Sequence, residues 1–281
     1  MASRRIRSAL VGVLVVALLA AIGVVWRPWE WWHPDRRWGT WADKRDQTFT
    51  ASDGTTSRYH VFAAGLSRDT VTGIVFQFHG DGAYEFDHPD SSYSLGGQTG
   101  IVEECRTRGY VVVAVLSPDT EGEVTWWENG AANAAYAAQL VATMTEEYSA
   151  GADNTWLVGY SGGSQFITQF YLPLWSSTLH GGGAVMFGGG GRPYNVVVQP
   201  FADGLRAHFL MFWYTGAADN GRSSEDGYNA LGDSVHGAKA GLGFYASAGF
   251  VTDHRWPSGM GHDLSQQFGE VLADQLDRHP R

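Results

Sequence analysis

The chain has only one cysteine, Cys105, among its 281 residues, so no intramolecular disulfide can form. If the protein is exported, as its N-terminus indicates below, its stability must therefore come from an apolar core. Cys105 lies within Thr99–Arg108, a pattern typical of a helix. This setting favours a buried structural thiol over a catalytic nucleophile.

Positive charge is also scarce. The sequence has 19 lysine and arginine residues against 29 aspartates and glutamates, which gives a formal net charge of −10. Residues 1–37 hold six of the arginines and two of the acids, so the net charge of the chain without them is −14. Such an acidic domain argues against a nucleic-acid partner and against a polybasic site for lipid headgroups.

Repeats, low-complexity tracts and a second linker are absent as well. Residues 47–281 have a normal length for one α/β domain. The stretch Gly188–Gly191, followed by Arg192, lacks the lysine and spacing of a P-loop and the acidic residue of a dinucleotide site. We interpret it as a turn, and we expect neither a metal nor an organic cofactor.

A long apolar run occurs once, at the N-terminus. Ser8–Trp26 carries no charge and is long enough to cross a bilayer. Arg4, Arg5 and Arg7 precede it, and a cationic N-terminus stays on the inner side, so the rest of the chain should face outward. The bulky residues after the run favour an uncleaved signal anchor over a cleaved signal peptide.

The domain organisation follows from this run. We expect a signal anchor or signal peptide at residues 1–32, a juxtamembrane linker at residues 33–46 and the α/β domain at residues 47–281. The protein should then sit in the cell membrane as a single-pass protein with its domain outside, or be secreted if the segment is cleaved. The membrane, through the N-terminal helix, is one expected partner, and the sequence leaves the oligomeric state open.

Strand and helix patterns alternate through the domain. Near-continuous apolar runs suit strands that are covered on both faces, as in a parallel sheet. We therefore predict an α/β fold with a mostly parallel central sheet flanked by helices, preceded by one N-terminal transmembrane or signal helix. The predicted strands are Arg58–Ala63 at a sheet edge, Thr72–His79, Tyr110–Leu116, Trp156–Val158, Gly183–Phe187, His208–Thr215 and Phe250–Trp256. The predicted helices are Thr99–Arg108, Asn129–Tyr148, Gln165–Tyr171, Ser234–Ser247 and Leu264–Arg278.

The segment from Trp156 to Tyr171 contains a G-x-S-x-G motif, Gly159–Gly163, between a predicted strand and a predicted helix. With 37 glycines in the chain, the motif alone could be a surface turn, and its position is what makes it informative. A strand, a sharp turn with serine at its apex and a helix form a nucleophile elbow. Ser161 is therefore the candidate nucleophile.

Two further residues complete a candidate triad. A serine hydroxyl needs a base, usually histidine, and an acid that orients it. Asp219 follows the strand ending at Thr215, and His262 stands in a glycine-flanked loop after the last strand. In the nucleophile-elbow architecture the chain order is serine, acid, histidine, as here. Asp219 could instead be a solvated turn residue and His262 a helix cap. The rival acids are Asp226 and Glu225, whereas Asp263 suits an N-terminal cap.

Backbone N–H groups should stabilise the oxyanion. Gly162, directly after the nucleophile, is one expected donor. The loop after the strand Thr72–His79 should supply the other, from Asp81 or Gly82. The same loop could be a plain β-turn. A metal site formed by His79 and Asp81 with His88 is the remaining alternative, and it matches no familiar ligand spacing.

On these motifs the sequence resembles the α/β-hydrolase superfamily from about Arg58 to Arg278. The resemblance implies that Ser161 is the nucleophile, Asp219 the acid and His262 the base, with no cofactor. The segment His79–Gly82 departs from the His-Gly-Gly-Gly form of lipases and esterases by placing a carboxylate at Asp81. Secreted feruloyl-esterase-like and polyester-depolymerase-like members are the most similar.

Four side chains near these loops are candidates for substrate contacts: His79, Tyr160, Trp126 and Trp127. The two tryptophans follow the strand Tyr110–Leu116 and could form a wall for an acyl or aryl group, or simply pack at a helix start. No long insertion lies between Gly188 and His208, so we expect a small lid and an open cleft.

The sequence therefore predicts an exported, membrane-anchored serine hydrolase that cleaves a small-molecule or polymer carboxylic ester through an acyl-serine intermediate. One alternative is a cell-envelope acyltransferase with the same triad. A peptidase is another. The alternative from a different class is a non-catalytic binding protein with the α/β-hydrolase fold.

Overall fold

The computed structural model describes residues 39–222 and 227–278. The chain divides into two units, Met1–Thr40 and Trp41–Arg281, and every element described below belongs to the second. The predicted signal anchor or signal peptide, residues 1–32, lies outside the described residues. Within the described part of the chain, no helix is both long and apolar enough to cross a membrane.

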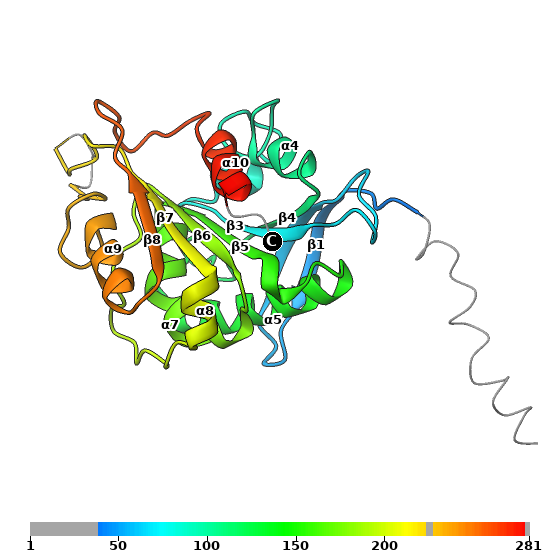
Figure 1. Ribbon diagram of the computed structural model, residues 1–281, viewed down its shortest axis with the longest axis horizontal. Helices are drawn as coiled ribbons and strands as arrows, with labels where there is room; N and C mark the ends of the chain where they lie inside the picture. The colour runs from blue at the N-terminus through cyan, green and yellow to red at the C-terminus, as the bar shows by residue number, and fades with distance from the viewer. Residues whose placement is uncertain (1–38, 223–226, 279–281) are drawn as a thin grey trace, which may run out of the picture. The chain divides into compact units, whose positions relative to one another are not determined.

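One sheet of eight strands forms the centre of the second unit (Figure 1). The strands are β1 (Lys44–Thr50), β2 (Thr56–Phe62), β3 (Gly73–Phe78), β4 (Tyr110–Val115), β5 (Thr155–Tyr160), β6 (Gly182–Phe187), β7 (Phe209–Tyr214) and β8 (Val251–Arg255). Their order is β1-β2-β4-β3-β5-β6-β7-β8. All neighbours from β4 to β8 are parallel, whereas β1–β2 and β2–β4 are antiparallel. The predicted mostly parallel sheet is confirmed.

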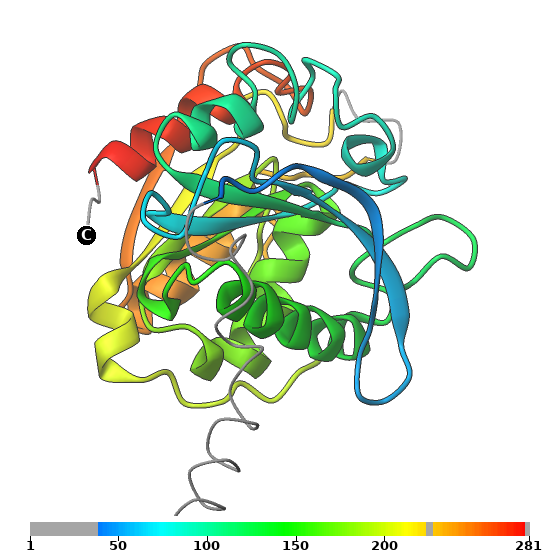
Figure 2. The same cartoon turned by 90° about the vertical axis from the view of Figure 1, so that its right-hand side faces the viewer.

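Helices cover both faces of the sheet, as predicted (Figures 1 and 2). One face carries α4 (Ile101–Arg106) and α10 (Phe268–Arg278), which pack on each other. The other carries α5 (Gly130–Glu147), α8 (Asp203–His208), α9 (Ala238–Ser247) and a helical run of α6 (Gly162–Phe166), a π-helical turn at Ile167–Tyr171 and α7 (Leu172–Trp175). Cys105 is fully buried on α4, where burial raises the pKa of its thiol, so the expectation of a structural thiol is confirmed.

The N-terminal edge of the domain differs from the prediction. β1 begins at Lys44, within the expected linker of residues 33–46, and Trp41 packs edge-on against Tyr148 at 5.0 Å. β2, whose pattern predicted an edge strand, lies between β1 and β4. The reason is that β1, with the sequence KRDQTFT, has Phe49 as its one apolar residue, so it lacks the apolar alternation that identifies a strand.

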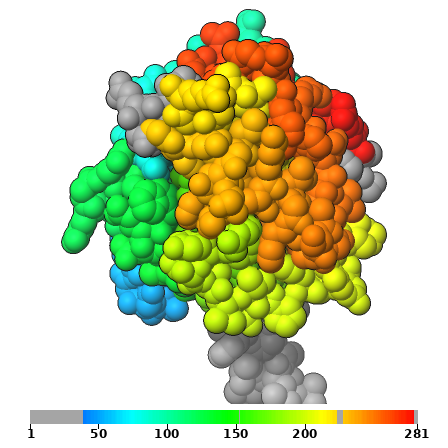
Figure 3. All heavy atoms as spheres, turned by 90° about the vertical axis from the view of Figure 1, so that its left-hand side faces the viewer, coloured from blue at the N-terminus to red at the C-terminus, as the bar shows by residue number. Residues whose placement is uncertain are grey.

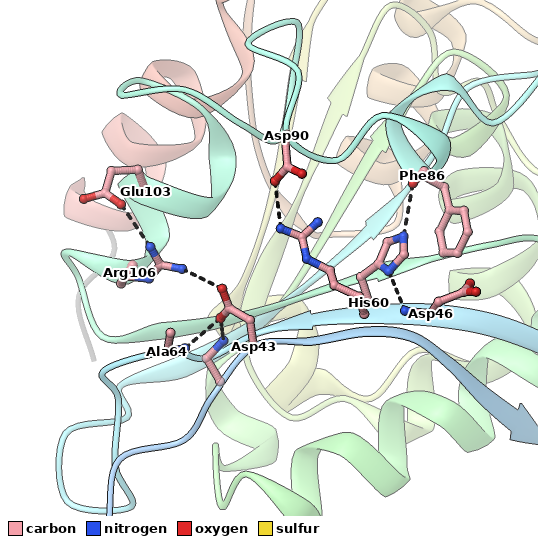
Figure 4. A network of polar contacts seen from close by, with 10 residues as sticks. Asp43, Asp46, His60, Ala64, Phe86, Asp90, Glu103 and Arg106 are labelled. Carbon is pink, nitrogen blue, oxygen red and sulfur yellow. Dashed lines mark hydrogen bonds and ion pairs between the residues drawn. The ribbon is translucent and has the colours of Figure 1, made fainter.

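Polar side chains hold this edge in place (Figure 4). Asp43 Oδ1 accepts the backbone N–H groups of Ala63 and Ala64, each at 2.8 Å. His60 accepts the N–H of Asp46 at Nδ1, at 2.8 Å, and donates from Nε2 to the carbonyl of Phe86 at 3.1 Å. Burial lowers the pKa of His60. These contacts join β1 to β2 and to the short helix α3 (Tyr84–Asp87).

The order of the strands fixes where a site can form. β4 lies on one side of β3 and β5 lies on the other, so the winding of the sheet reverses between β3 and β5. Ligands of open α/β sheets bind at such a reversal, outside the carboxyl ends of the strands. Phe78 pairs with Gly159 at these ends, which brings the loop after β3 beside the turn after β5.

Candidate functional site

Ser161 stands at the apex of a strained turn between β5 and α6. Its φ of 49° and ψ of −113° lie in a region that non-glycine residues rarely adopt. Its N–H donates to the carbonyl of Phe187 on β6 at 2.9 Å, and its carbonyl accepts the N–H of Gln165 at 3.1 Å. These bonds hold the serine at the carboxyl edge of the sheet, where its side chain remains partly exposed.

Two glycines allow the turn to close. A Cβ on Gly159 would collide with the backbone of Gly163, and a Cβ on Gly163 would collide with the carbonyl of Phe78 on β3. The strand and the helix therefore approach more closely than other residues permit. Ser164 locks the turn by donating from Oγ to the carbonyls of Gly159 and Phe187, at 2.7 and 2.8 Å. The strand–turn–helix predicted around Ser161 is confirmed.

Ser161, His262 and Asp219 form one chain of hydrogen bonds. His262 Nε2 lies 2.9 Å from Ser161 Oγ, and His262 Nδ1 lies 2.7 Å from Asp219 Oδ2. The Asp219 carboxylate accepts a hydrogen bond from the Nδ1–H group of His262. This fixes the tautomer in which Nε2 is unprotonated and can accept the serine proton. The Asp219 side chain is 2% exposed and that of His262 is 33% exposed. The acid is thus enclosed while the base faces the open site.

The carboxyl ends of β7 and β8 supply the acid and the base. Asp219 follows β7 in a turn where its N–H donates to Gly216 and its carbonyl accepts the N–H of Leu231. Tyr160 donates from its hydroxyl to the carbonyl of His262 at 3.0 Å, and their rings lie 5.2 Å apart. Tyr160, predicted to contact substrate, therefore supports the loop of the base.

Asp263 accepts the N–H of Ser265 at 2.9 Å, so it stabilises a turn before α10 rather than joining the triad. Asp226 and Glu225, the rival acids, lie outside the described residues.

The loop after β3 keeps one of its two candidate N–H donors available. Gly82 N–H donates to the carbonyl of Val124 at 3.0 Å, so it is not available to an oxyanion, contrary to expectation. Gly80 N–H donates to the buried carboxylate of Glu85 at 3.0 Å. In the described part of the chain, the N–H of Asp81 has no acceptor. Asp81 and Gly162 are thus the two positions left for an oxyanion hole.

His79 does not line the site. It is fully buried, its Nδ1 donates to the carbonyl of Gly80 at 2.6 Å, and its Nε2 accepts the N–H of Ser117 at 3.0 Å. Burial lowers the pKa of His79 to about 4, so the ring is neutral near pH 7. The prediction of a substrate contact is wrong here, because both ring nitrogens are used to tie β3 to the end of β4.

The two neighbouring tryptophans have different surroundings. Trp126 is fully buried and packs on Phe78 and Phe166, with ring centroids 5.1 and 4.6 Å apart, so it belongs to the core rather than to a substrate wall. Trp127 is 39% exposed, and its Nε1 donates to both carboxylate oxygens of Asp81. Of the predicted pair, only Trp127 stands at the site.

A groove of about 770 Å³ lies next to the nucleophile. Its lining includes Trp127 and also Gln165, whose N–H donates to the carbonyl of Ser161, and the segments that form it meet on the face shown in Figure 3. The rest of its lining consists of Glu128, Asn129, Gly130, Ala131, Ala132, Gln169, Phe170, Tyr194, Asn195, Val196 and His236. No local pattern in the sequence indicates this groove, because these residues come from four separate segments.

Tyr228 was also missed. Its ring lies 6.2 Å from that of His262, nearly perpendicular to it, and its hydroxyl donates to the carbonyl of His236 at 3.2 Å. Tyr228 thus lies beside the ring of the base. Nothing in the local pattern around Tyr228 distinguishes it from an ordinary loop residue.

The alternative of a metal site at His79 and Asp81 finds no support in the geometry. His79 uses both ring nitrogens internally, and His88 is exposed and stacks on Tyr84 at 4.3 Å. Among residues 39–222 and 227–278, no group of three His, Cys, Asp or Glu side chains could hold a metal ion.

Comparison with known proteins gives structural matches alone. No protein-family model and no curated protein matches the chain. A carboxylesterase from Bacillus cereus superimposes with a TM-score of 0.56 at 16% identity, over 79% of this chain and 93% of that one. A carboxylesterase from Mesorhizobium loti gives 0.55 at 16% identity, over 82% and 98%.

A third match is a protein of Xanthomonas campestris, XC6422, described as an α/β serine hydrolase without a lid. It gives a TM-score of 0.52 at 12% identity, over 84% of this chain and 94% of that one. Identities this low establish a shared fold. Together with the parallel sheet and its covering helices, they show that the chain has the α/β-hydrolase fold, as the motifs implied.

Proposed function

We propose that the protein is a serine hydrolase that cleaves carboxylic esters through an acyl intermediate on Ser161. The observation that carries the proposal is the continuous hydrogen-bonded chain from Ser161 Oγ through His262 to Asp219. It stands at the sheet's carboxyl edge on a strained turn, where strain positions a nucleophile. The carboxylesterases among the structural matches support an ester as the substrate.

Acylation would begin with attack of Ser161 Oγ on the ester carbonyl carbon, while His262 Nε2 takes the hydroxyl proton. The negative charge that develops on the carbonyl oxygen would be stabilised by the N–H groups of Gly162 and Asp81. His262 then gives its proton to the alkoxide oxygen, and the alcohol leaves. Asp219 keeps Nδ1 protonated and stabilises the imidazolium formed in between.

Deacylation would repeat the sequence with water as the nucleophile. His262 removes a proton from water, the hydroxide oxygen attacks the acyl carbon, and Ser161 leaves with the returned proton. The partly exposed base suits this step, since water must reach Nε2. The same geometry accepts an alcohol in place of water, which would make the reaction an acyl transfer.

We propose also that the enzyme is exported and held at the cell membrane by residues 1–32. The uncharged run Ser8–Trp26 after Arg4, Arg5 and Arg7 supports this location. The test is fractionation of cells that express the full chain. Recovery with membranes, released by detergent but not by high salt, is expected, and recovery in the soluble cytoplasmic fraction would contradict the proposal.

The activity is tested on the purified full chain with p-nitrophenyl esters of increasing acyl length. We expect turnover, and mass spectrometry after a rapid acid quench should find the acyl group on the peptide that contains Ser161. Ser161→Ala should abolish both signals, whereas Asp263→Asn, a matched change of a neighbouring acid, should leave them intact. Ester cleavage that survives Ser161→Ala would contradict the mechanism. Adding an alcohol and measuring the ester product separates hydrolysis from acyl transfer.

A further inference from the structure

The side chain of Asp81 has no part in the proposed reaction, yet it lies against the reacting centre. A Cβ added to Gly162 would overlap Asp81 Oδ1, so the carboxylate covers the residue that follows the nucleophile. Trp127 Nε1 donates to both of its oxygens, at 3.1 and 3.0 Å. A carboxylate can accept about four hydrogen bonds, and within the described residues this one accepts from Trp127 alone.

The electrostatic surroundings of this carboxylate are unfavourable for its charge. Partial desolvation raises the pKa of Asp81, and repulsion from Glu123 and Glu128 raises it further, while the bond from Trp127 lowers it. An oxyanion formed at Gly162 would add more negative charge nearby. A positive group on the substrate would offset both, because opposite charges at contact distance attract each other.

The adjoining groove has the lining that a cation would need. Two of its lining residues contact the site. Trp127 donates a hydrogen bond to the Asp81 carboxylate, and the N–H of Gln165 donates to the carbonyl of Ser161. Three aromatic residues, Trp127, Phe170 and Tyr194, line it, and the acidic residue Glu128 lines it as well. Among the described residues that line the groove there is no lysine or arginine. Aromatic faces beside carboxylates attract alkylammonium groups.

We propose that the site selects esters that carry an alkylammonium group, with Asp81 as the specificity-determining residue and the aromatic groove as the place where the cation binds. The inference rests on the proposed ester hydrolysis and names its substrate class. The substrate carbonyl would meet the N–H groups of Gly162 and Asp81, while the ammonium lies beside the hydrogen-bonded pair of the Asp81 carboxylate and Trp127. An ester with an anionic group would be repelled by the same carboxylates.

The test compares isosteric esters that differ only in charge, with the full chain as enzyme. In the first pair the esters differ in the alcohol: butyrylcholine is cationic, and its isostere 3,3-dimethylbutyl butyrate is neutral because carbon replaces the nitrogen. In the other pair they differ in the acid: p-nitrophenyl esters of a trimethylammonio-alkanoic acid and of its tert-butyl isostere. We expect kcat/KM to favour the cationic ester in at least one pair by about tenfold, and the ratio to fall as salt is added.

Asp81→Asn isolates the charge, because it keeps the backbone N–H and an acceptor for Trp127. It should bring the cationic-to-neutral ratio of kcat/KM close to one, and this ratio is the readout, because both esters use the same oxyanion hole and any change there cancels between them. Asp277→Asn is the matched control, since it removes the same charge from α10, where Asp277 pairs with Arg108. This variant should keep the wild-type ratio.

The outcomes separate this inference from the proposed function. Equal kcat/KM within both pairs, or a cationic preference that Asp81→Asn leaves unchanged, overturns the selection by Asp81 while ester hydrolysis stands. Absence of turnover with every ester, together with absence of an acyl group on Ser161, rejects the proposed function and this inference with it. A preference lost in Asp81→Asn and kept in Asp277→Asn supports both.

Discussion

The centre of the sheet and its β1–β2 edge are held by different kinds of contact. At the centre, α6 approaches β5 and β3 so closely that only glycine fits at Gly159 and Gly163, and Ser161 keeps a strained conformation. At the edge, the largely exposed strand β1 is tied to β2 and the residues after it by the side chains of Asp43 and His60. The first region stores strain around a reactive group, and the second supplies stability. Changes in the two should therefore affect different measurements.

The largest expected effect is on activity at the centre. Ser161→Ala and His262→Ala should each lower kcat by about a million-fold, because the nucleophile and the base act as one unit. The double variant should be no worse than either single one. Circular dichroism and urea unfolding should stay close to wild type, since the Ser161 hydroxyl contacts little besides His262. A large loss of stability in Ser161→Ala would contradict the comparison, because the centre would then affect stability as the β1–β2 edge does.

Asp219→Asn should have the next largest effect. The amide cannot hold His262 in the tautomer that accepts the serine proton, and such a change lowers kcat by about ten thousand-fold in known triads. Steady-state kinetics on a p-nitrophenyl ester measures it, with Asp263→Asn as the control. If Asp263→Asn gave the larger loss, the assignment of the acid would be wrong.

A third prediction concerns stability against pH. Burial lowers the pKa of His79 from its ordinary value of 6.5 to about 4, so the ring is neutral in the fold while the unfolded chain takes up a proton below pH 6.5. Above pH 6.5 the ring is neutral in both states, so it causes no loss of stability. As the pH falls from 6.5 toward 4, only the unfolded chain takes up this proton, and the free energy of unfolding falls by about 3 kcal/mol. His60, whose pKa is also lowered, should add a loss in the same direction.

Urea unfolding of wild type and His79→Gln from pH 7 to pH 4 measures this contribution. The variant is expected to be less stable at pH 7 and to lose less stability on acidification. The same acid sensitivity in both proteins would show that His79 does not titrate as its burial indicates. His60→Gln provides the comparison at the β1–β2 edge.

The smallest effect is expected at the edge. Asp43→Ala leaves the N–H groups of Ala63 and Ala64 without their acceptor and removes the ion pair with Arg106. We expect a loss of about 1–3 kcal/mol in the free energy of unfolding, with kcat/KM unchanged. Urea unfolding and ester kinetics on the same sample measure both. Loss of activity in a folded Asp43→Ala would mean that the edge and the site are coupled.

The same comparison explains what the sequence could predict. The buried strands and the order of Ser161, Asp219 and His262 were visible because apolar runs and glycine-flanked turns are local signals. β1 was missed because its polar residues gain their partners only from distant parts of the chain, such as Glu147 for Lys44 and Asp90 for Arg45. His79, Trp126 and Gly82 were assigned to the site by position, whereas long-range contacts to Ser117, Phe166 and Val124 use their polar atoms or bury their rings.

The groove and Tyr228 were beyond prediction for the same reason. Their residues come together only when the segments after β4, β6 and β7 fold over the carboxyl edge of the sheet. The proposed substrate selection therefore depends on contacts that no short motif records, whereas each reacting group stands in a short motif that follows one strand.

The most direct test of an activated serine is labelling of the full chain with a fluorophosphonate, followed by peptide mapping. Phosphonylation requires a serine whose proton is taken by a base, so it reports the hydrogen-bonded chain itself rather than a chosen substrate. We predict one label per chain, on Ser161, that is lost in His262→Ala and kept in Asp263→Asn. A folded protein that stays unlabelled, or a label on another serine, would contradict the assignment of Ser161 as the nucleophile.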